Sequence, residues 1–145
     1  MSEMLGNRYL LELRFEEAIP HFESRLRREP ADRRTAQKLA LCHALSGHRD
    51  AAVRWVRRAL EASVEESLPE EVIWRELVAA IRSRAGELGP TRSALGLALA
   101  RLFRDPAEAS GTLEHAMEDA PDVVWLRDVL LAFERRLEAS DDTTL

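Results

Sequence analysis

Cysteine and long apolar segments are almost absent from this chain of 145 residues. Cys42 is the one cysteine, so no internal disulfide can form. There is no run of eighteen apolar residues that would predict a membrane-spanning helix, and the N-terminus lacks the basic and apolar blocks of a secretory signal. These absences favour a reducing compartment, and we expect the protein to be cytoplasmic. Cys42 lies in the apolar stretch LALCHAL, where a small buried side chain is expected rather than a reactive thiol.

Motifs that position a reaction are missing as well. The sequence contains no glycine-rich phosphate loop, no G-x-S-x-G motif and no H-E-x-x-H motif. Cys42 and His43 are adjacent, so on a helix their side chains point about 100° apart. His43 and His48 flank an expected turn with a spacing that is not typical of a metal site, and His21 and His115 stand alone. We therefore expect no catalytic residue, no metal and no cofactor, and an enzyme is the weakest alternative.

Aromatic residues make up 6% of the chain, and lysine occurs once, at Lys38. Hydrophobic residues make up 46% and charged residues 32%, a balance typical of a folded and soluble protein rather than a disordered one. Leu and Ala dominate the apolar residues, and β-branched residues are few, which favours helix over strand. The composition therefore predicts an all-α fold.

The charge is distributed unevenly along the chain. The net charge of −5 is unusual for a protein that binds duplex nucleic acid, so we expect no such partner. Residues 1–62 carry twelve basic and nine acidic side chains, whereas residues 63–145 carry nine basic and seventeen acidic ones. Five arginines of the first half form a possible basic docking face for an acidic partner: Arg27, Arg28, Arg54, Arg57 and Arg58. The alternative is an ordinary solvated helix face.

Two stretches of the first half resemble one another at a shift of 34 residues. LRFEEAIPHFESRLRREP, residues 13–30, aligns with GHRDAAVRWVRRALEAS, residues 47–63. Small residues coincide at Ala18 and Ala52, and larger apolar residues coincide at Phe22 and Val56. A 34-residue period with two helices per unit resembles the tetratricopeptide repeat. The resemblance implies hairpins in which the small residue lets two helices approach and the large residue fills the space between them.

The same resemblance implies an α-α superhelix, or solenoid, of about four helical hairpins in a single domain, residues 1–140. Repeats are expected at 1–31 and 32–65, a degenerate third repeat at 66–106, and a degenerate fourth repeat or capping helices at 107–140. A disordered tail is expected at 141–145. Helices are predicted at 2–12, 14–29, 32–45, 50–62, 69–88, 106–119 and 122–139, with another between Gly89 and Pro106.

Local signals mark several helix ends. Asp32 is expected to be an N-cap, and Pro69 is expected at the first position of its helix. Gly47 and Gly89 are expected in the turns between paired helices. Pro20 removes a backbone donor just beyond the first turn of its helix, so a kink or a late start is expected there.

In the tetratricopeptide family, the first helices of the repeats line a concave groove that binds a partner protein. By register, the resemblance places eight residues of the helices 2–12 and 32–45 in this groove: Asn7, Leu10, Leu11, Arg34, Gln37, Leu41, Ala44 and Leu45. The apolar members predict a site for an extended or helical peptide. The alternative is that these residues pack against a neighbouring helix.

Three functions remain open on this evidence. The first is a bacterial scaffold or adaptor that binds another protein through the groove or the basic face. The second is a cytosolic chaperone for a secretion-system substrate, because LALCHALSGHRDAA resembles the second repeat of type III secretion class II chaperones. The third is a self-assembling subunit, since Trp55, Trp74 and Trp125 are many for a small helical chain and exposed tryptophans favour interfaces.

Overall fold

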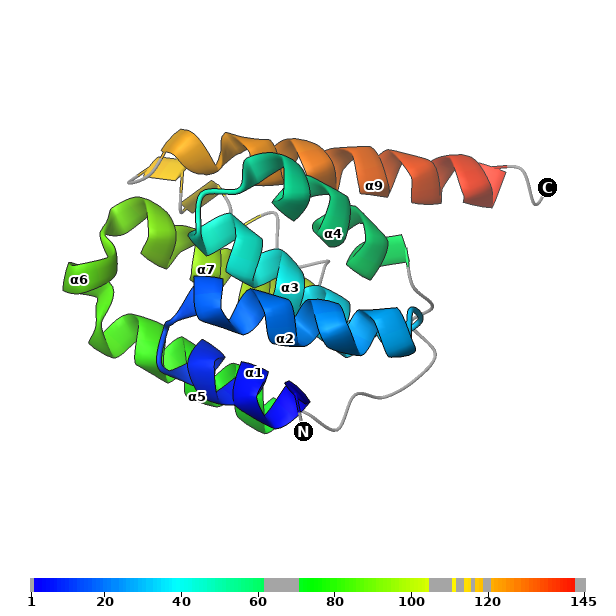
Figure 1. Ribbon diagram of the computed structural model, residues 1–145. Coiled ribbons are helices and arrows are strands. Elements are labelled where there is room, and N and C mark those ends of the chain that lie inside the picture. The colour runs from blue at the N-terminus through cyan, green and yellow to red at the C-terminus, as the bar shows by residue number, and fades with distance from the viewer. Residues whose placement is uncertain are drawn as a thin grey trace.

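The computed structural model describes residues 2–61, 71–104, 111, 114–115, 117–118 and 121–142. Within these residues the regular elements are all helical and no strand occurs, which confirms the predicted all-α fold (Figure 1). None of the described helices combines the length and the apolar character needed to cross a membrane.

The first half of the chain forms two helical hairpins. Helices α1 (Ser2–Leu11) and α2 (Phe15–Arg28) pair with one another, as do α3 (Arg33–Leu45) and α4 (Arg49–Glu61), and α2 packs on α3. Each predicted helix of this half lies within one residue of its observed bounds. The aligned repeat residues Ala18, Phe22, Ala52 and Val56 are all fully buried.

Side-chain caps and backbone conformation set the ends of these helices. The Asp32 carboxylate accepts hydrogen bonds from the Thr35 backbone N–H at 3.2 Å and from the Thr35 hydroxyl at 2.8 Å, so the predicted N-cap is confirmed. Burial raises the pKa of Asp32, but the hydrogen bonds from Thr35 and Arg25 outweigh it and lower the pKa below its ordinary value. Gly47 has a φ of 83°, as its turn position requires. Pro20 lies inside α2, which begins at Phe15, so of the two outcomes expected there, a kink or a late start, the late start is wrong.

The second half contains α5 (Glu71–Ser83), α6 (Ala85–Leu88), α7 (Pro90–Arg104), the short 3-10 helix η1 (Pro121–Val123) and α9 (Val124–Asp142). The single helix predicted at 69–88 is interrupted at Arg84, where α5 ends and the short α6 begins. Gly89 has a φ of 87° in the predicted turn. The proposed start at Pro69 and the stop at Pro106 lie outside the described residues, as does most of the helix predicted at 106–119. Helix α9 extends to Asp142, into the segment expected to be a disordered tail.

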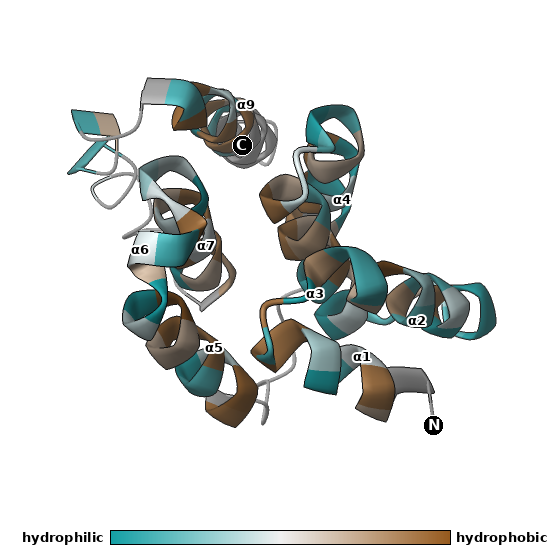
Figure 2. Ribbon diagram, turned by 60° about the vertical axis from the view of Figure 1, so that its left-hand side comes forward, coloured by the Kyte–Doolittle hydropathy of each residue, from teal (hydrophilic) through white to brown (hydrophobic). Residues whose placement is uncertain are grey.

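The helices of the second half lie along one side of the first half. Helix α5 packs beside α1, α7 packs against α3, and α9 packs against α4. Figure 2 shows α1, α3 and α4 on one side and α5, α7 and α9 on the other, with apolar segments turned toward the space between them. Side chains from both halves form one core, in which Leu41, Leu77, Leu99 and Leu126 are fully buried.

Candidate functional site

The residues predicted to line a groove are mostly interior residues. Leu10 is 1% exposed, Leu41 is not exposed, and Leu45 is 2% exposed. Ala44 and Gln37 are buried as well, while Asn7, Leu11 and Arg34 are half-buried. The expectation of an exposed apolar groove is therefore wrong, because α5 and α7 pack on the faces of α1 and α3 that an open groove would expose. The alternative, packing against the protein's own helices, is the one observed.

Two polar members of this predicted set face the interior without satisfying their hydrogen-bonding capacity. Gln37 is 1% exposed, and neither its Oε1 nor its Nε2 has a hydrogen-bond partner in the described structure. Asn7 likewise has a buried Oδ1 without a partner there. Buried amides in folded proteins are normally paired with protein groups or with ordered water.

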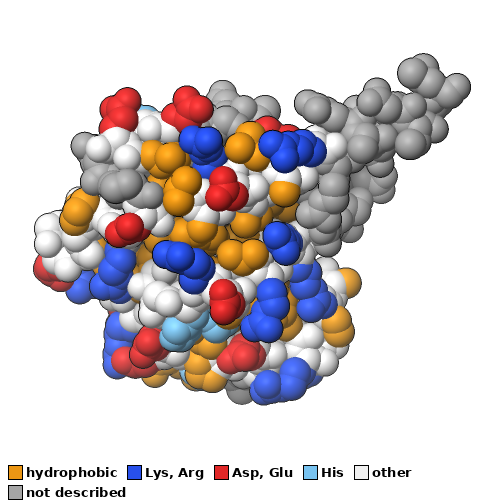
Figure 3. Space-filling view, turned by 90° about the horizontal axis from the view of Figure 1, so that it is seen from above, with side chains coloured by type: hydrophobic (Ala, Val, Ile, Leu, Met, Phe, Trp, Pro, Cys, Tyr) orange, Lys and Arg blue, Asp and Glu red, His pale blue; other side chains and the backbone are white. Residues whose placement is uncertain are grey.

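The five arginines of the predicted basic face are all exposed. Arg27 and Arg28 lie in the last turn of α2. On α4, Arg54 lies about one turn before the adjacent Arg57 and Arg58. None of the five forms an ion pair with a described residue under a 4.0 Å limit. In Figure 3, basic side chains lie across the exposed surface with acidic side chains between them.

Arg58 joins the two groups of arginines. Its Nη2 donates a hydrogen bond to the backbone oxygen of Pro30 at 2.8 Å, which ties α4 to the turn that follows α2. The Arg58 guanidinium also lies 5.1 Å from the centre of the Trp55 ring. This stacking leaves Trp55 half-buried beneath a cation. Arg58 therefore links α4 of the second hairpin to the turn that follows α2 of the first.

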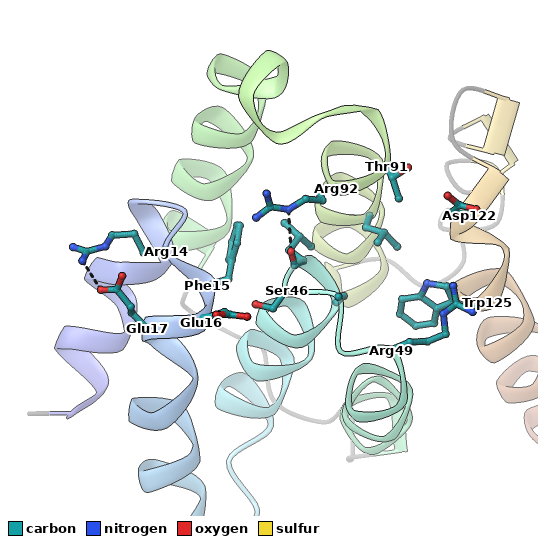
Figure 4. A pocket seen from close by; sticks show the side chains of 14 residues that line it. Arg14, Phe15, Glu16, Glu17, Ser46, Arg49, Thr91, Arg92, Asp122 and Trp125 are labelled. Atoms are coloured by element: carbon teal, nitrogen blue, oxygen red, sulfur yellow. Dashed lines mark hydrogen bonds and ion pairs between the residues drawn. The ribbon is translucent and has the colours of Figure 1, made fainter.

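A concave surface lies at one end of the molecule, where several helices begin. It is an open pocket of about 770 Å³ lined by the starts of α2, α4, α7 and α9 and by the end of α3 (Figure 4). Phe15, Leu45 and Leu95 form buried apolar parts of its lining, and Trp125 forms a half-buried wall. The pocket is large enough for a small organic ligand or a few residues of a peptide.

The polar residues of the pocket differ in their ion pairs and hydrogen bonds. Arg14 pairs with Glu17, and Arg92 donates from Nε to the backbone oxygen of Leu45 at 2.9 Å. The Arg92 guanidinium lies 5.8 Å from the centre of the Phe15 ring. Ser46, also in the lining, has a buried Oγ without a hydrogen-bond partner in the described structure.

Sequence reasoning did not find this pocket as a whole, although Ala44 and Leu45 of its lining belong to the predicted groove residues. Its residues come from four separate segments of the chain, and none of these segments carries a recognisable ligand-binding motif. Their common signal is position, since each segment lies at or near a helix end or in a turn. That signal identifies a site only when the packing of the two halves is known.

The structure brings together two histidines that the sequence left apart. The Nδ1 atoms of His43 and His48 are 3.0 Å apart, and the ring centres are 5.3 Å apart. The two Nδ1 atoms face each other. This arrangement suits a hydrogen bond in which one imidazole donates and the other imidazole, which is neutral, accepts. Nε2 of His48 lies 3.6 Å from the Glu16 carboxylate. Among the described residues, no group of three or more His, Cys, Asp and Glu side chains could hold a metal ion.

The histidine pair predicts a loss of stability in acid. Burial lowers the pKa of His43 from its ordinary value of 6.5, the charges of His48 and Arg54 lower it further, and Glu23 opposes them. The unfolded chain then takes up this proton before the folded protein does, so the stabilising effect is full above pH 6.5 and falls as the pH drops toward the lower folded pKa. Urea unfolding measured at about pH 8 and about pH 5 should show that the free energy of unfolding falls more between these pH values for wild type than for His43→Gln.

His115→Gln is the matched control for this prediction, because it removes a histidine whose side chain is 83% exposed. The free energy of unfolding of this variant should follow wild type between the two pH values. Equal pH dependence in wild type and His43→Gln would contradict the prediction.

The structure also places Cys42 and the three tryptophans that were noted in the sequence. Cys42 is fully buried, which confirms its expected role as a small apolar residue, and burial raises the pKa of its thiol. Trp74 is 5% exposed and packs on Phe103, with ring centres 5.7 Å apart. With Trp55 and Trp125 both half-buried, the three tryptophans do not form an exposed aromatic surface.

Comparison of the chain with protein-family models, with curated proteins and with solved structures finds no match.

Proposed function

We propose that this protein is an interaction adaptor that binds an acidic segment of another protein through its basic face. The observation that carries the proposal is the set of five exposed arginines on α2 and α4, none of which pairs with a described carboxylate. Like charges one turn apart on a helix repel each other, so the cluster lowers stability unless a counter-charge binds it. The resemblance of the first two hairpins to tetratricopeptide repeats supports a protein-binding role.

The chemistry of the face favours carboxylates on a flexible segment. Guanidinium groups form two parallel hydrogen bonds with a carboxylate, which a single ammonium group cannot do. The arginines come from two helices, so a partner with several Asp or Glu side chains can contact more than one of them at once. In this proposal the partner lies on the outside of the hairpins, since the inner leucines are already covered.

The proposal predicts which peptides the protein selects from a random library. It also predicts how far charge reversal on the basic face weakens the binding of these peptides. Peptides rich in Asp and Glu should be enriched, and Arg54→Glu/Arg57→Glu should weaken their binding about tenfold, because two favourable charge contacts become repulsive. Affinity should also fall as salt rises. The measurement is a fluorescence anisotropy titration of the enriched peptides against each variant.

Arg75→Glu/Arg82→Glu provides the matched control. Both residues are exposed on α5, outside the basic face, and the double variant has the same net charge as the test variant. It should retain most of the wild-type affinity. An equal loss in both double variants would show a general charge effect and would reject a specific docking face, as would a selection without acidic enrichment.

A further inference from the structure

We propose that His43 and His48 together bind a divalent transition-metal ion such as Zn²⁺, a function separate from the binding of an acidic partner. The two histidines flank the turn between α3 and α4, although their spacing in the sequence is not typical of a metal site. The backbone N–H of His48 donates to the backbone oxygen of His43 at 2.9 Å, and Gly47 between them has a φ of 83°. The closed turn therefore holds the two side chains on the same side of the backbone.

The separation of the two imidazoles is close to what one metal ion requires. Their Nδ1 atoms lie 3.0 Å apart, and the ring centres are 5.3 Å apart. In a tetrahedral zinc site, with each nitrogen about 2.0–2.1 Å from the ion, two ligand nitrogens lie about 3.3 Å apart and their ring centres about 5.2 Å apart. Small rotations of the two side chains are therefore enough to direct both Nδ1 lone pairs at one ion.

The protonation of the pair suits metal binding, which requires neutral imidazoles. Burial lowers the pKa of His43, and the charges of His48 and Arg54 lower it further, so His43 is uncharged at neutral pH. When the ion binds, the ring that carries its proton on Nδ1 transfers it through water to its own Nε2. A neutral pair thus takes up the ion without a net change in bound protons.

Carboxylates on α2 support the pair. The Glu16 carboxylate lies 3.6 Å from Nε2 of His48, which favours the tautomer with the proton on Nε2 and leaves the Nδ1 lone pair for a metal. Glu23 adds a second negative charge near His43, while Arg54 on α4 contributes a positive one. Two carboxylates against one guanidinium give surroundings that favour a cation.

The number of protein ligands indicates what kind of site this is. Within the part of the chain that the structure describes, no three His, Cys, Asp or Glu side chains could hold an ion, so the two imidazoles bind it and water completes its coordination. The His48 side chain is 46% exposed, so an ion can reach the pair from solvent. Imidazole ligands favour zinc, copper and nickel over Mg²⁺. We therefore expect an exchangeable metal ion rather than a structural one.

The test is a titration of the ¹⁵N-labelled full chain with zinc chloride, followed by NMR of the imidazole nitrogens. The Nδ1 signals of His43 and His48 should shift with a saturating dependence, while the ring signals of His21 and His115 stay in place. Mg²⁺ at the same concentrations should shift none of the four. Equal shifts of all four histidines, or no saturable shift of His43 and His48, would overturn the proposal.

Substitutions test the two ligands separately. His43→Gln and His48→Gln should each weaken zinc binding at least about tenfold in calorimetry, because a single imidazole remains. His21→Gln and His115→Gln are the matched controls and should retain the wild-type affinity. If His43→Gln fails to fold, His48→Gln decides the question, because it replaces an exposed side chain. Unchanged affinity in His48→Gln, or an equal loss in the controls, would show that the ion binds elsewhere.

Discussion

Replacement of Leu41 by alanine is expected to lower the free energy of unfolding by about 2–5 kcal/mol. Leu41 is fully buried in the central helix α3, with α7 packed against that helix, so removing its side chain leaves a cavity that neighbouring groups fill only in part. Had Leu41 lined an open groove, truncation would have altered partner binding and left stability nearly unchanged. Urea unfolding followed by circular dichroism measures the difference.

Leu5→Ala is the control for this experiment. Leu5 lies on α1 and is 45% exposed, so its truncation should change the free energy of unfolding by only about 0.5 kcal/mol. Similar small losses for both variants would contradict the closed arrangement of the two halves. Leu41→Glu, which would place a charge in the core, should prevent folding and cannot be used to test partner binding.

Alanine at position 6 is expected to destabilise the protein by about 1–3 kcal/mol, although alanine is the better helix former. A Cβ at Gly6 would lie 2.6 Å from Cε1 of Phe22, far closer than ordinary contact. Phe22 is fully buried, so its ring has little room to move. The two helices of the first hairpin must therefore separate or the ring must leave its preferred rotamer, and thermal or urea unfolding should report the loss.

Gly86→Ala is the matched control, since nothing lies within 4 Å of a Cβ at that position and its φ is not positive. It should leave stability unchanged or raise it slightly. The double variant Gly6→Ala/Phe22→Leu tests the mechanism, because the smaller side chain makes room for the methyl group. Its loss should be less than the sum of the two single losses, and strict additivity would contradict the proposed clash.

The helices of the first half could be predicted from sequence because their signals are local. Asp32 caps a helix, Gly47 provides a left-handed turn, and Ala18 and Phe22 repeat at helical spacing. Gly6 was missed, because a single glycine in a helix does not reveal which side chain approaches it. Leu13 was also missed: it adopts a φ of 61° without being a glycine, and it is 8% exposed in the turn between α1 and α2.

The location of the candidate sites could not be predicted in the same way. Burial of Leu10, Leu41 and Leu45 depends on helices that follow more than twenty-five residues later, and register within a repeat does not say whether a later helix covers the groove. The arginines of the basic face could be predicted, because runs of charge on an amphipathic helix identify its solvent side. The pocket residues Leu45 and Arg92 meet only through the packing of α7 on α3.

The return of α5, α7 and α9 onto α1, α3 and α4 has a consequence for how the chain unfolds. In a linear array of repeats each unit touches its neighbours alone, so the ends can open while the middle persists. Here the earliest and latest segments share one interior, and neither half can detach without exposing the other's apolar side chains to water. The molecule should therefore open and close as one cooperative unit, with its slowest-exchanging amides in the central helix α3.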